Sequence, residues 1–273
     1  MLSSIIPSIM RLFSGLVSDA DASALLEAHD SGVVNVNWKQ VELFMQTHPE
    51  HDYVLVDVRE PGEYDSAHVA GAWLIPLGDV LSGGPGFAKL KKTSYPFKFV
   101  MCRGGRRSAK AASHLASVAS LSGLFNVSGG ISAWTGPTLS GMPKVTPGQL
   151  KTPTDVRDLV DRLAAQTKKS LTEFAARNAG EHVEVSDAFD AVKRHAEQLK
   201  TQLASPSDNP TVETDKSLVD AIPLALLPPL RQVALNDYDL FRNLAHEATS
   251  DKLQNALLTV AEQQKHFVIA LSS

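Results

Sequence analysis

The chain has 273 residues, of which 43% are hydrophobic and 21% are charged, and its formal net charge is -4. This apolar fraction excludes a disordered chain, and the near balance of charges excludes a generally basic, nucleic-acid-binding surface. The one cysteine, Cys102, excludes an internal disulfide and any metal site that needs two cysteine ligands. At about 150 residues per domain, this length predicts two domains.

Residues 1–22 carry apolar side chains at helical spacing, among them Ile5, Ile9 and Phe13. We expect an amphipathic helix here that packs on its own protein or on a second subunit, rather than on a membrane surface. No lysine or arginine precedes the apolar stretch, and Pro7 and Arg11 interrupt it. A signal peptide or a membrane span is therefore not expected, and the predicted location is cytoplasmic.

Residues 30–146 alternate strand and helix patterns, as in a parallel sheet flanked by helices. Tyr53–Val58 and Phe97–Met101 are short, largely apolar runs typical of strands that are buried on both faces. Strong helix formers follow from Ser108 to Val118. Cys102 and a glycine-bearing turn therefore lie between a strand and a helix, at the edge of the sheet where α/β folds bind ligands.

The turn after Cys102 has the residues of an anion cradle; they are Arg103, Gly104, Gly105, Arg106, Arg107 and Ser108. The two glycines allow successive N–H groups to point at one atom, and the start of the helix adds partial positive charge. The three arginines attract an anionic substrate and favour a thiolate. The alternative is a buried, inert cysteine beside a solvated basic turn.

Four motifs in this region resemble those of the single-domain rhodaneses, a family of sulfurtransferases. The motifs are Asp57–Tyr64, Ala67–Pro76, Cys102–Ser108, and Gly129–Trp134 followed by Gly141–Pro143. The chain departs from the family at Ala67, where glycine is usual, and at Leu74, where asparagine is usual. The resemblance implies an α/β rhodanese-like domain over residues 30–146, with Cys102 as catalytic residue and the loop from Arg103 to Ser108 as the persulfide-binding site.

Four other polar residues of these motifs are predicted to support the structure; they are Asp57, Arg59, Glu63 and His68. Polar groups at strand ends commonly tie a sheet to its loops through hydrogen bonds. We expect that role for all four rather than direct contact with a substrate.

The length of the loop separates sulfur transfer from the phosphatase chemistry that the same fold hosts. A cysteine phosphatase loop has five residues between its cysteine and an arginine, but here Ser108 occupies the arginine position and Arg107 comes one residue earlier. The resemblance implies that this shorter loop holds a single sulfane sulfur. Phosphatase activity and arsenate reduction are the less favoured alternatives.

The resemblance implies a two-step reaction through a covalent persulfide on Cys102, with no other cofactor. The donor is a small anionic sulfur compound such as thiosulfate, a polysulfide or a persulfide. Since the chain has no second cysteine, the acceptor is an external thiol, a protein, or cyanide in an assay. The alternative is a sulfur-binding or sensing adaptor with negligible turnover, whose helical part binds a partner.

Residues 152–273 show only helical patterns, beginning with Thr152 as N-cap and Pro153 after it. The apolar spacing predicts a helix that stops at Asn178–Gly180, a second over 185–203, and a short one over 218–227 that Pro228 and Pro229 end. Two further helices are predicted from Leu230 and from Leu253. Two antiparallel pairs joined by a long connection form a four-helix bundle with one crossover.

Ferritin-like proteins share this topology, and Tyr238–Ala245 with Ala261–Phe267 resembles the rubrerythrin group. A di-iron site in such a bundle needs Glu-x-x-His on two helices. Glu262 has its nearest following histidine four positions on, at His266, and no glutamate after residue 148 has one at three. We therefore predict no metal site, and we expect the bundle to mediate homodimerisation or to dock a sulfur donor or acceptor.

Overall fold

The computed structural model describes residues 33–142, 150–177, 185–204, 219–220 and 222–272. The chain divides into two compact units between Met142 and Pro143. The first is called the sheet unit and the second the helical unit below. The helix predicted over residues 1–22 lies outside the described residues.

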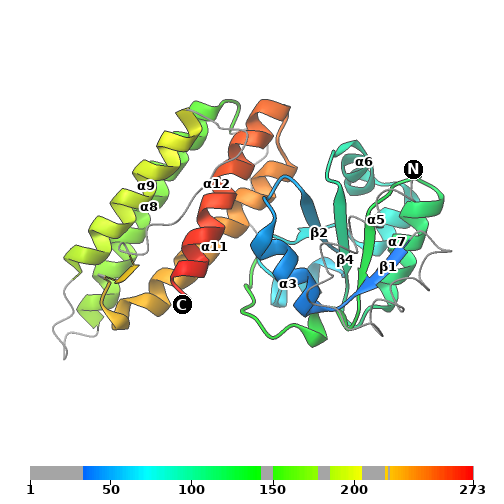
Figure 1. Ribbon diagram of the computed structural model, residues 1–273, viewed down its shortest axis with the longest axis horizontal. Coiled ribbons are helices and arrows are strands. Elements are labelled where there is room, and N and C mark those ends of the chain that lie inside the picture. Colours follow the sequence, from blue (N-terminus) through cyan, green and yellow to red (C-terminus); the bar gives the residue numbers. More distant parts are fainter. Residues whose placement is uncertain (1–32, 143–149, 178–184, 205–218, 221, 273) are drawn as a thin grey trace. The chain divides into compact units, whose positions relative to one another are not determined.

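The sheet unit is built on a five-stranded parallel sheet with the strand order β1-β5-β4-β2-β3 (Figure 1). Its strands are β1 (Val33–Val36), β2 (Tyr53–Asp57), β3 (Trp73–Leu74), β4 (Phe97–Met101) and β5 (Leu124–Val127). Every residue of β2 and β5 is buried, which explains why these strands are nearly continuous apolar runs. The predicted parallel sheet is confirmed.

Helices cover both faces of the sheet (Figure 1). They are α3 (Trp38–Thr47), α4 (Pro61–Ser66), α5 (Leu77–Ser82), α6 (Pro85–Lys92) and α7 (Arg106–Ser117). Phe99 and Phe125 pack with Phe44 of α3 in the main core. Because successive residues of a strand point to opposite faces, Asn126 faces away from this core, toward α7. The sheet therefore separates the core under α3 from the face that carries α7.

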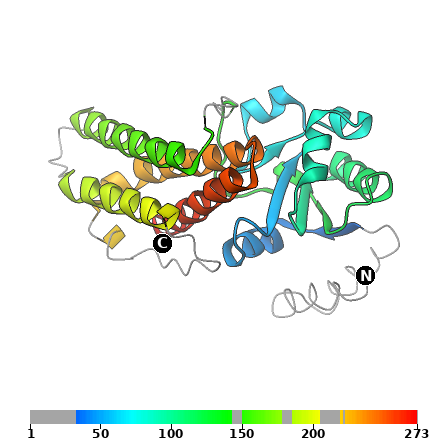
Figure 2. The same ribbon diagram turned by 90° about the horizontal axis from the view of Figure 1, so that it is seen from above.

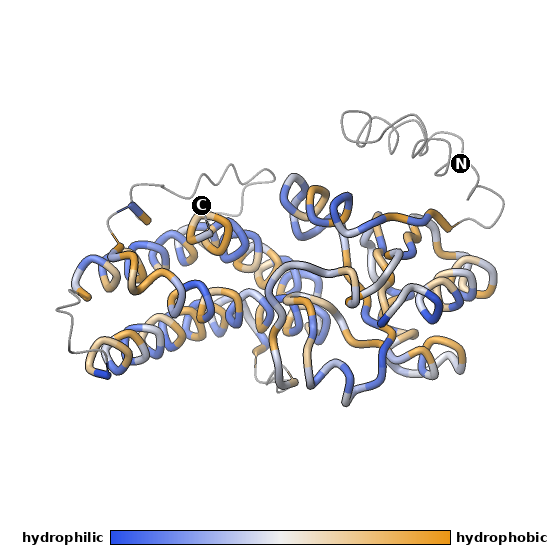
Figure 3. Tube along the Cα trace, turned by 90° about the horizontal axis from the view of Figure 1, so that it is seen from below, coloured by the Kyte–Doolittle hydropathy of each residue, from blue (hydrophilic) through white to orange (hydrophobic). Residues whose placement is uncertain are grey.

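The described part of the helical unit contains four long helices (Figures 1 and 2). They are α8 (Pro153–Arg177), α9 (Ser186–Ala204), α11 (Leu227–His246) and α12 (Asp251–Ala270). Hydrophobic and hydrophilic residues alternate around each of them, as Figure 3 shows, and the apolar sides meet in one core. The predicted helical C-terminal region is confirmed. Among the described residues, no helix has the length and apolar character needed to cross a bilayer.

One helix boundary was predicted wrongly. Pro228 and Pro229 do not end a helix; they stand in the first turn of α11, which begins at Leu227. The first N–H groups of a helix have no acceptor within it, so proline is tolerated there. Of the short helix predicted over 218–227, residues 219–220 are helical and Leu224–Leu226 form a 3-10 turn, η3, whereas residues 218 and 221 lie outside the described residues.

Candidate active site

Cys102 lies directly after β4, and its loop leads into α7. Gly105 is the N-cap of α7 and has a φ of 95°, a left-handed conformation that glycine adopts without strain. This turn lets the helix begin at Arg106, two residues before the predicted start. The free N–H groups and positive end of a 12-residue helix therefore adjoin the cysteine loop.

The sulfur of Cys102 is buried and hydrogen-bonded. Cys102 is only 1% exposed, the Gly105 N–H donates to its Sγ at 3.1 Å, and the Ser108 Oγ lies 3.4 Å from that sulfur. Burial by itself raises the pKa of the thiol. The Ser108 hydroxyl and the N–H groups of Ser108, Gly104 and Gly105 outweigh this effect, so the pKa of Cys102 lies below its ordinary value. The loop thus stabilises a thiolate.

Gly130 holds the backbone of the cysteine loop from the other side. The next N–H, of Ile131, donates to the Cys102 carbonyl at 2.8 Å. A Cβ on Gly130 would lie 2.1 Å from that carbonyl oxygen and 2.7 Å from the carbonyl carbon of Arg103. The Gly130 carbonyl in turn accepts from Trp38 Nε1 of α3 at 2.6 Å. The closing glycine motif therefore clamps the loop, and only glycine fits there.

The three loop arginines differ in their surroundings. Arg107 forms a two-pronged ion pair with Glu63 of α4, with Nη1–Oε2 at 2.6 Å and Nη2–Oε1 at 2.7 Å. This pair lowers the pKa of Glu63 to about 2 and raises the pKa of Arg107. Arg103 and Arg106 are exposed. The charge of Arg107 is thus balanced by a carboxylate, whereas Arg103 and Arg106 face solvent.

Asp57 and Arg59 join the end of β2 to α4. Their ion pair measures 2.7 Å from Nη2 to Oδ2, and the same Arg59 nitrogen donates to the Ala67 carbonyl at 2.7 Å. His68 stacks on the ring of Tyr64 with centroids 3.9 Å apart, and its Nδ1 lies 3.1 Å from the Tyr64 carbonyl oxygen. These contacts are with neighbouring backbone and side chains rather than with the sulfur.

Two asparagines that were not among the predicted site residues also belong to this constellation. Asn126 Oδ1 of β5 accepts from the Ser108 hydroxyl at 2.7 Å, and Asn126 Nδ2 donates to Asn35 Oδ1 of β1 at 2.8 Å. The sequence does hold a signal for Asn126. Asparagine is depleted in strands, yet it stands in the buried run Leu-Phe-Asn-Val. A polar residue in such a strand indicates a specific hydrogen bond.

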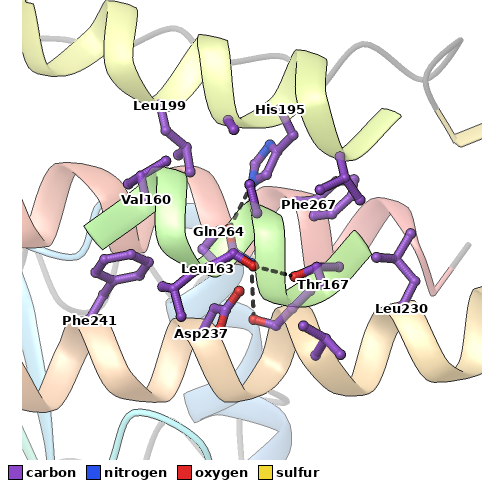
Figure 4. Close-up of a pocket in the computed structure, with 15 residues that line it drawn as sticks. Val160, Leu163, Thr167, His195, Leu199, Leu230, Asp237, Phe241, Gln264 and Phe267 are labelled. Atoms are coloured by element: carbon purple, nitrogen blue, oxygen red, sulfur yellow. Dashed lines mark hydrogen bonds between the residues drawn. The ribbon is translucent and has the colours of Figure 1, made fainter. Parts of the chain in front are cut away.

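The helical unit has a cavity of about 30 Å³ between its four long helices, with room for one or two water molecules (Figure 4). Its lining is mostly apolar, but each helix adds one polar side chain; these are Thr167, His195, Asp237 and Gln264. His195 Nε2 lies 2.7 Å from Gln264 Oε1. Burial lowers the pKa of His195 to about 4, although Gln264 opposes this shift, and raises the pKa of Asp237 to about 7.

Among the described residues, no three His, Cys, Asp or Glu side chains come together to hold a metal ion. Glu262 of α12 instead pairs with Lys265 at 3.1 Å and with His266 at 3.0 Å, both on its own helix. The spacing of four noted in the sequence therefore corresponds to an intrahelical contact.

Known proteins resemble the sheet unit. Residues 40–137 match the family model described as the rhodanese-like domain. A stretch of 82 residues is 42% identical to a probable adenylyltransferase/sulfurtransferase MoeZ of Mycobacterium tuberculosis, which covers 29% of this chain and 19% of that protein. A 40-residue stretch is 50% identical to an uncharacterized 16.5 kDa protein of Synechococcus elongatus, covering 15% of this chain and 26% of that one.

The crystal structure of a rhodanese-like domain protein from Staphylococcus aureus aligns with this chain with a TM-score of 0.33 and 22% identity, covering 40% of this chain and 98% of that one. The matched segments thus span about a fifth to a quarter of the length of the curated relatives.

Proposed function

We propose that the rhodanese-like domain at residues 40–137 makes this protein a sulfurtransferase, in which Cys102 carries a sulfane sulfur from a donor to an acceptor. The observation that carries the proposal is the hydrogen-bonded sulfur of Cys102, which lies among the loop N–H groups at the start of α7. The word sulfurtransferase in the name of the mycobacterial relative agrees with it.

In the first step, the Cys102 thiolate attacks the outer sulfur of the donor. With thiosulfate, a new S–S bond forms to Cys102, the S–S bond of the donor breaks, and sulfite leaves with the electron pair. The lowered pKa of Cys102 supplies the thiolate. The exposed Arg103 and Arg106 attract the anionic donor to the loop.

The product of this step is a persulfide anion on Cys102, which the loop is built to hold. The Gly105 N–H already donates to the inner sulfur at 3.1 Å. The remaining loop N–H groups and the positive end of α7 stabilise the charge on the outer sulfur. The clamp at Gly130 keeps these donors in place, because it fixes the Cys102 and Arg103 backbone.

In the second step, an acceptor removes the outer sulfur. A thiolate attacks it, the persulfide S–S bond breaks, and the electron pair returns to Cys102 as its thiolate. Cyanide reacts in the same way and leaves as thiocyanate. Because Cys102 is the one cysteine of the chain, the acceptor thiol belongs to another molecule, either a small thiol or a protein. The helical unit is the part we assign to docking such a partner or a second copy of the chain.

The decisive experiment is intact-protein mass spectrometry after exposure to thiosulfate, polysulfide or a low-molecular-weight persulfide. The unaltered chain should gain about 32 Da, and a reducing thiol should remove it. Cys102→Ser should gain nothing. A gain that persists in this variant would place the sulfur elsewhere, and no gain in the unaltered chain with any donor would refute the proposal.

Steady-state transfer from thiosulfate to cyanide and to a thiol separates an enzyme from an adaptor. We expect many turnovers per molecule of the unaltered chain, and no transfer to either acceptor by Cys102→Ser. A single stoichiometric loading without turnover would instead show a sulfur-binding adaptor.

A further inference from the structure

The hydroxyl group of Ser108 has one hydrogen and three acceptors within reach. Its Oγ lies 2.7 Å from Asn126 Oδ1, 3.0 Å from the Gly105 carbonyl oxygen and 3.4 Å from the Cys102 sulfur. Because a hydroxyl donates one hydrogen at a time, these acceptors compete for it. The shortest of the three contacts is the one to Asn126.

The orientation of Asn126 follows from its other neighbour. Asn35 is directly opposite Asn126 in the register of β1 and β5, and its Oδ1 accepts from Asn126 Nδ2 at 2.8 Å. With the NH2 group committed to Asn35, the carbonyl oxygen of the Asn126 side chain faces Ser108. Asn126 therefore meets Ser108 as an acceptor, and because Asn126 is buried, water does not replace this contact.

We propose that Asn126 is a positioning residue that, held by Asn35, competes with Cys102 for the hydroxyl hydrogen of Ser108 and so limits the hydrogen bond that reaches the sulfur. The proposal deepens the sulfur-carrier function proposed above and rests on it. While the sulfur is a neutral thiol, Asn126 is the better acceptor. Once it becomes a thiolate or a persulfide anion, its charge makes it the stronger acceptor, and the hydroxyl turns to it.

For sulfur transfer, the amount of thiolate has to be balanced against its nucleophilicity. A thiolate that is stabilised fully is abundant but less nucleophilic, because nucleophilicity falls as the thiol pKa falls. Because the Ser108 hydroxyl must give up its hydrogen bond to Asn126 in order to reach the sulfur anion, the anion gains less net stabilisation and stays more reactive. Asn126 does this without touching the sulfur itself, through Ser108 alone.

The charged groups around Cys102 stay the same in this scheme. On the loop and the neighbouring elements they are Arg103, Arg106, Arg107, Lys110, Glu63, Asp57 and Arg59. Substitutions at Asn126, Asn35 or Ser108 alter none of them. A change in the Cys102 pKa in such variants therefore reports the hydrogen bonds rather than a change of charge.

The test is the pH dependence of Cys102 alkylation by iodoacetamide in the full chain, where the single cysteine makes the reaction site-specific. Asn126→Leu removes the competing acceptor at similar side-chain volume, so the Cys102 pKa should fall by about 0.5 to 1 unit. Asn35→Ala, on an exposed position of β1, releases the Asn126 amide and should shift the pKa in the same direction by less. An unchanged or raised pKa in Asn35→Ala and in any folded Asn126→Leu overturns the proposal.

A double-mutant cycle shows whether Asn126 acts through Ser108. Ser108→Ala alone should raise the Cys102 pKa, since the hydroxyl donor is lost. On that background, Asn126→Leu should leave the pKa unchanged within about 0.2 unit. A fall as large as in the chain that keeps Ser108 would show that Asn126 acts by repacking, which overturns the proposal.

Alkylation needs no sulfur substrate, so this result is independent of the proposed function. Failure of the unaltered chain to gain sulfur would refute the sulfur-carrier role while leaving the pKa shifts measurable. Normal loading with no pKa shift in the variants would refute the role of Asn126 alone.

Discussion

The sheet unit and the helical unit both bury polar side chains, but they arrange them differently. In the sheet unit, Asp57 pairs with Arg59, and Ser108 bridges Asn126 and Cys102, so the polar groups form short chains of bonds at strand ends. In the helical unit, four polar residues, one from each helix, surround a small cavity. Ser108 and Asn126 thus lie beside one nucleophile in the first unit, whereas the four cavity residues of the second come from four different helices.

This difference explains why only the first arrangement leaves a recognisable motif. A loop at a strand end places its chemistry on consecutive residues, here Cys102 to Ser108. A layer shared by four helices takes one residue from each, at positions as far apart as Thr167 and Gln264. Each of these looks like an isolated interruption of an apolar helix face.

The largest effect is expected from a substitution that removes the buried ion pair between Asp57 and Arg59 in the sheet unit. Arg59→Met leaves the fully buried Asp57 carboxylate without its partner, which should lower the free energy of unfolding by about 3 to 5 kcal/mol. All three tryptophans, Trp38, Trp73 and Trp134, lie in this unit, so their fluorescence during urea unfolding reports it separately.

Lys39→Met on the exposed side of α3 is the matched control for this substitution and should change little. If Arg59→Met costs less than about 1 kcal/mol, the buried pair is not what ties β2 to α4.

A smaller effect tests the clamp on the cysteine loop. Gly130→Ala forces the Cys102 and Arg103 backbone to move and adds a side chain at a φ of 50°, so we expect a loss of about 2 to 4 kcal/mol and a higher Cys102 pKa. Tryptophan fluorescence and iodoacetamide alkylation measure the two effects. Gly78→Ala in α5, where a Cβ meets nothing within 4 Å, is the control. Equal behaviour of the two variants would contradict the clamp.

In the helical unit, two groups should make stability depend on pH in opposite directions. The pKa of His195 is lowered from 6.5 to about 4. Its contribution to the free energy of unfolding is therefore present above pH 6.5 and is lost as the pH falls to about 4. The pKa of Asp237 is raised from 3.8 to about 7, so its contribution is present at low pH and is lost as the pH rises through this range. In the unaltered chain the two largely cancel.

A variant that lacks one of the two groups should show the pH dependence that the other group causes. As the pH falls from about 6.5 to 4.5, the free energy of unfolding of Asp237→Asn should fall by about 2 kcal/mol relative to that of the unaltered chain. That of His195→Gln should rise by a similar amount over the same range. Urea unfolding followed by far-ultraviolet circular dichroism measures both, with tryptophan fluorescence marking the sheet unit. Parallel pH profiles in all three proteins would show that the cavity groups do not titrate as described.

Prediction from sequence succeeded where neighbours in sequence are neighbours in space. Sequence reasoning could predict the succession of β4, Cys102, the glycine turn and α7, because these follow one another along the chain. Asn35 and Asn126 were not, because strand pairing brings them together across 91 positions. The position of Pro228 was predicted wrongly for another reason. A proline in the first turn of a helix and a proline after the end of one have the same sequence pattern, and only the structure shows that Pro228 begins α11.

The strand order also sets when the site comes into existence. β1 is made first, yet its partner in the sheet is β5, the last strand, which enters between β1 and β4. The clamp at Gly130 follows β5 in the chain. During synthesis, Cys102 therefore leaves the ribosome well before its cradle can close, and the sheet cannot assemble strand by strand from its start. The contacts that Gly130 and Asn126 make with the cysteine loop and with Ser108 therefore form only after β5 has taken its place in the sheet.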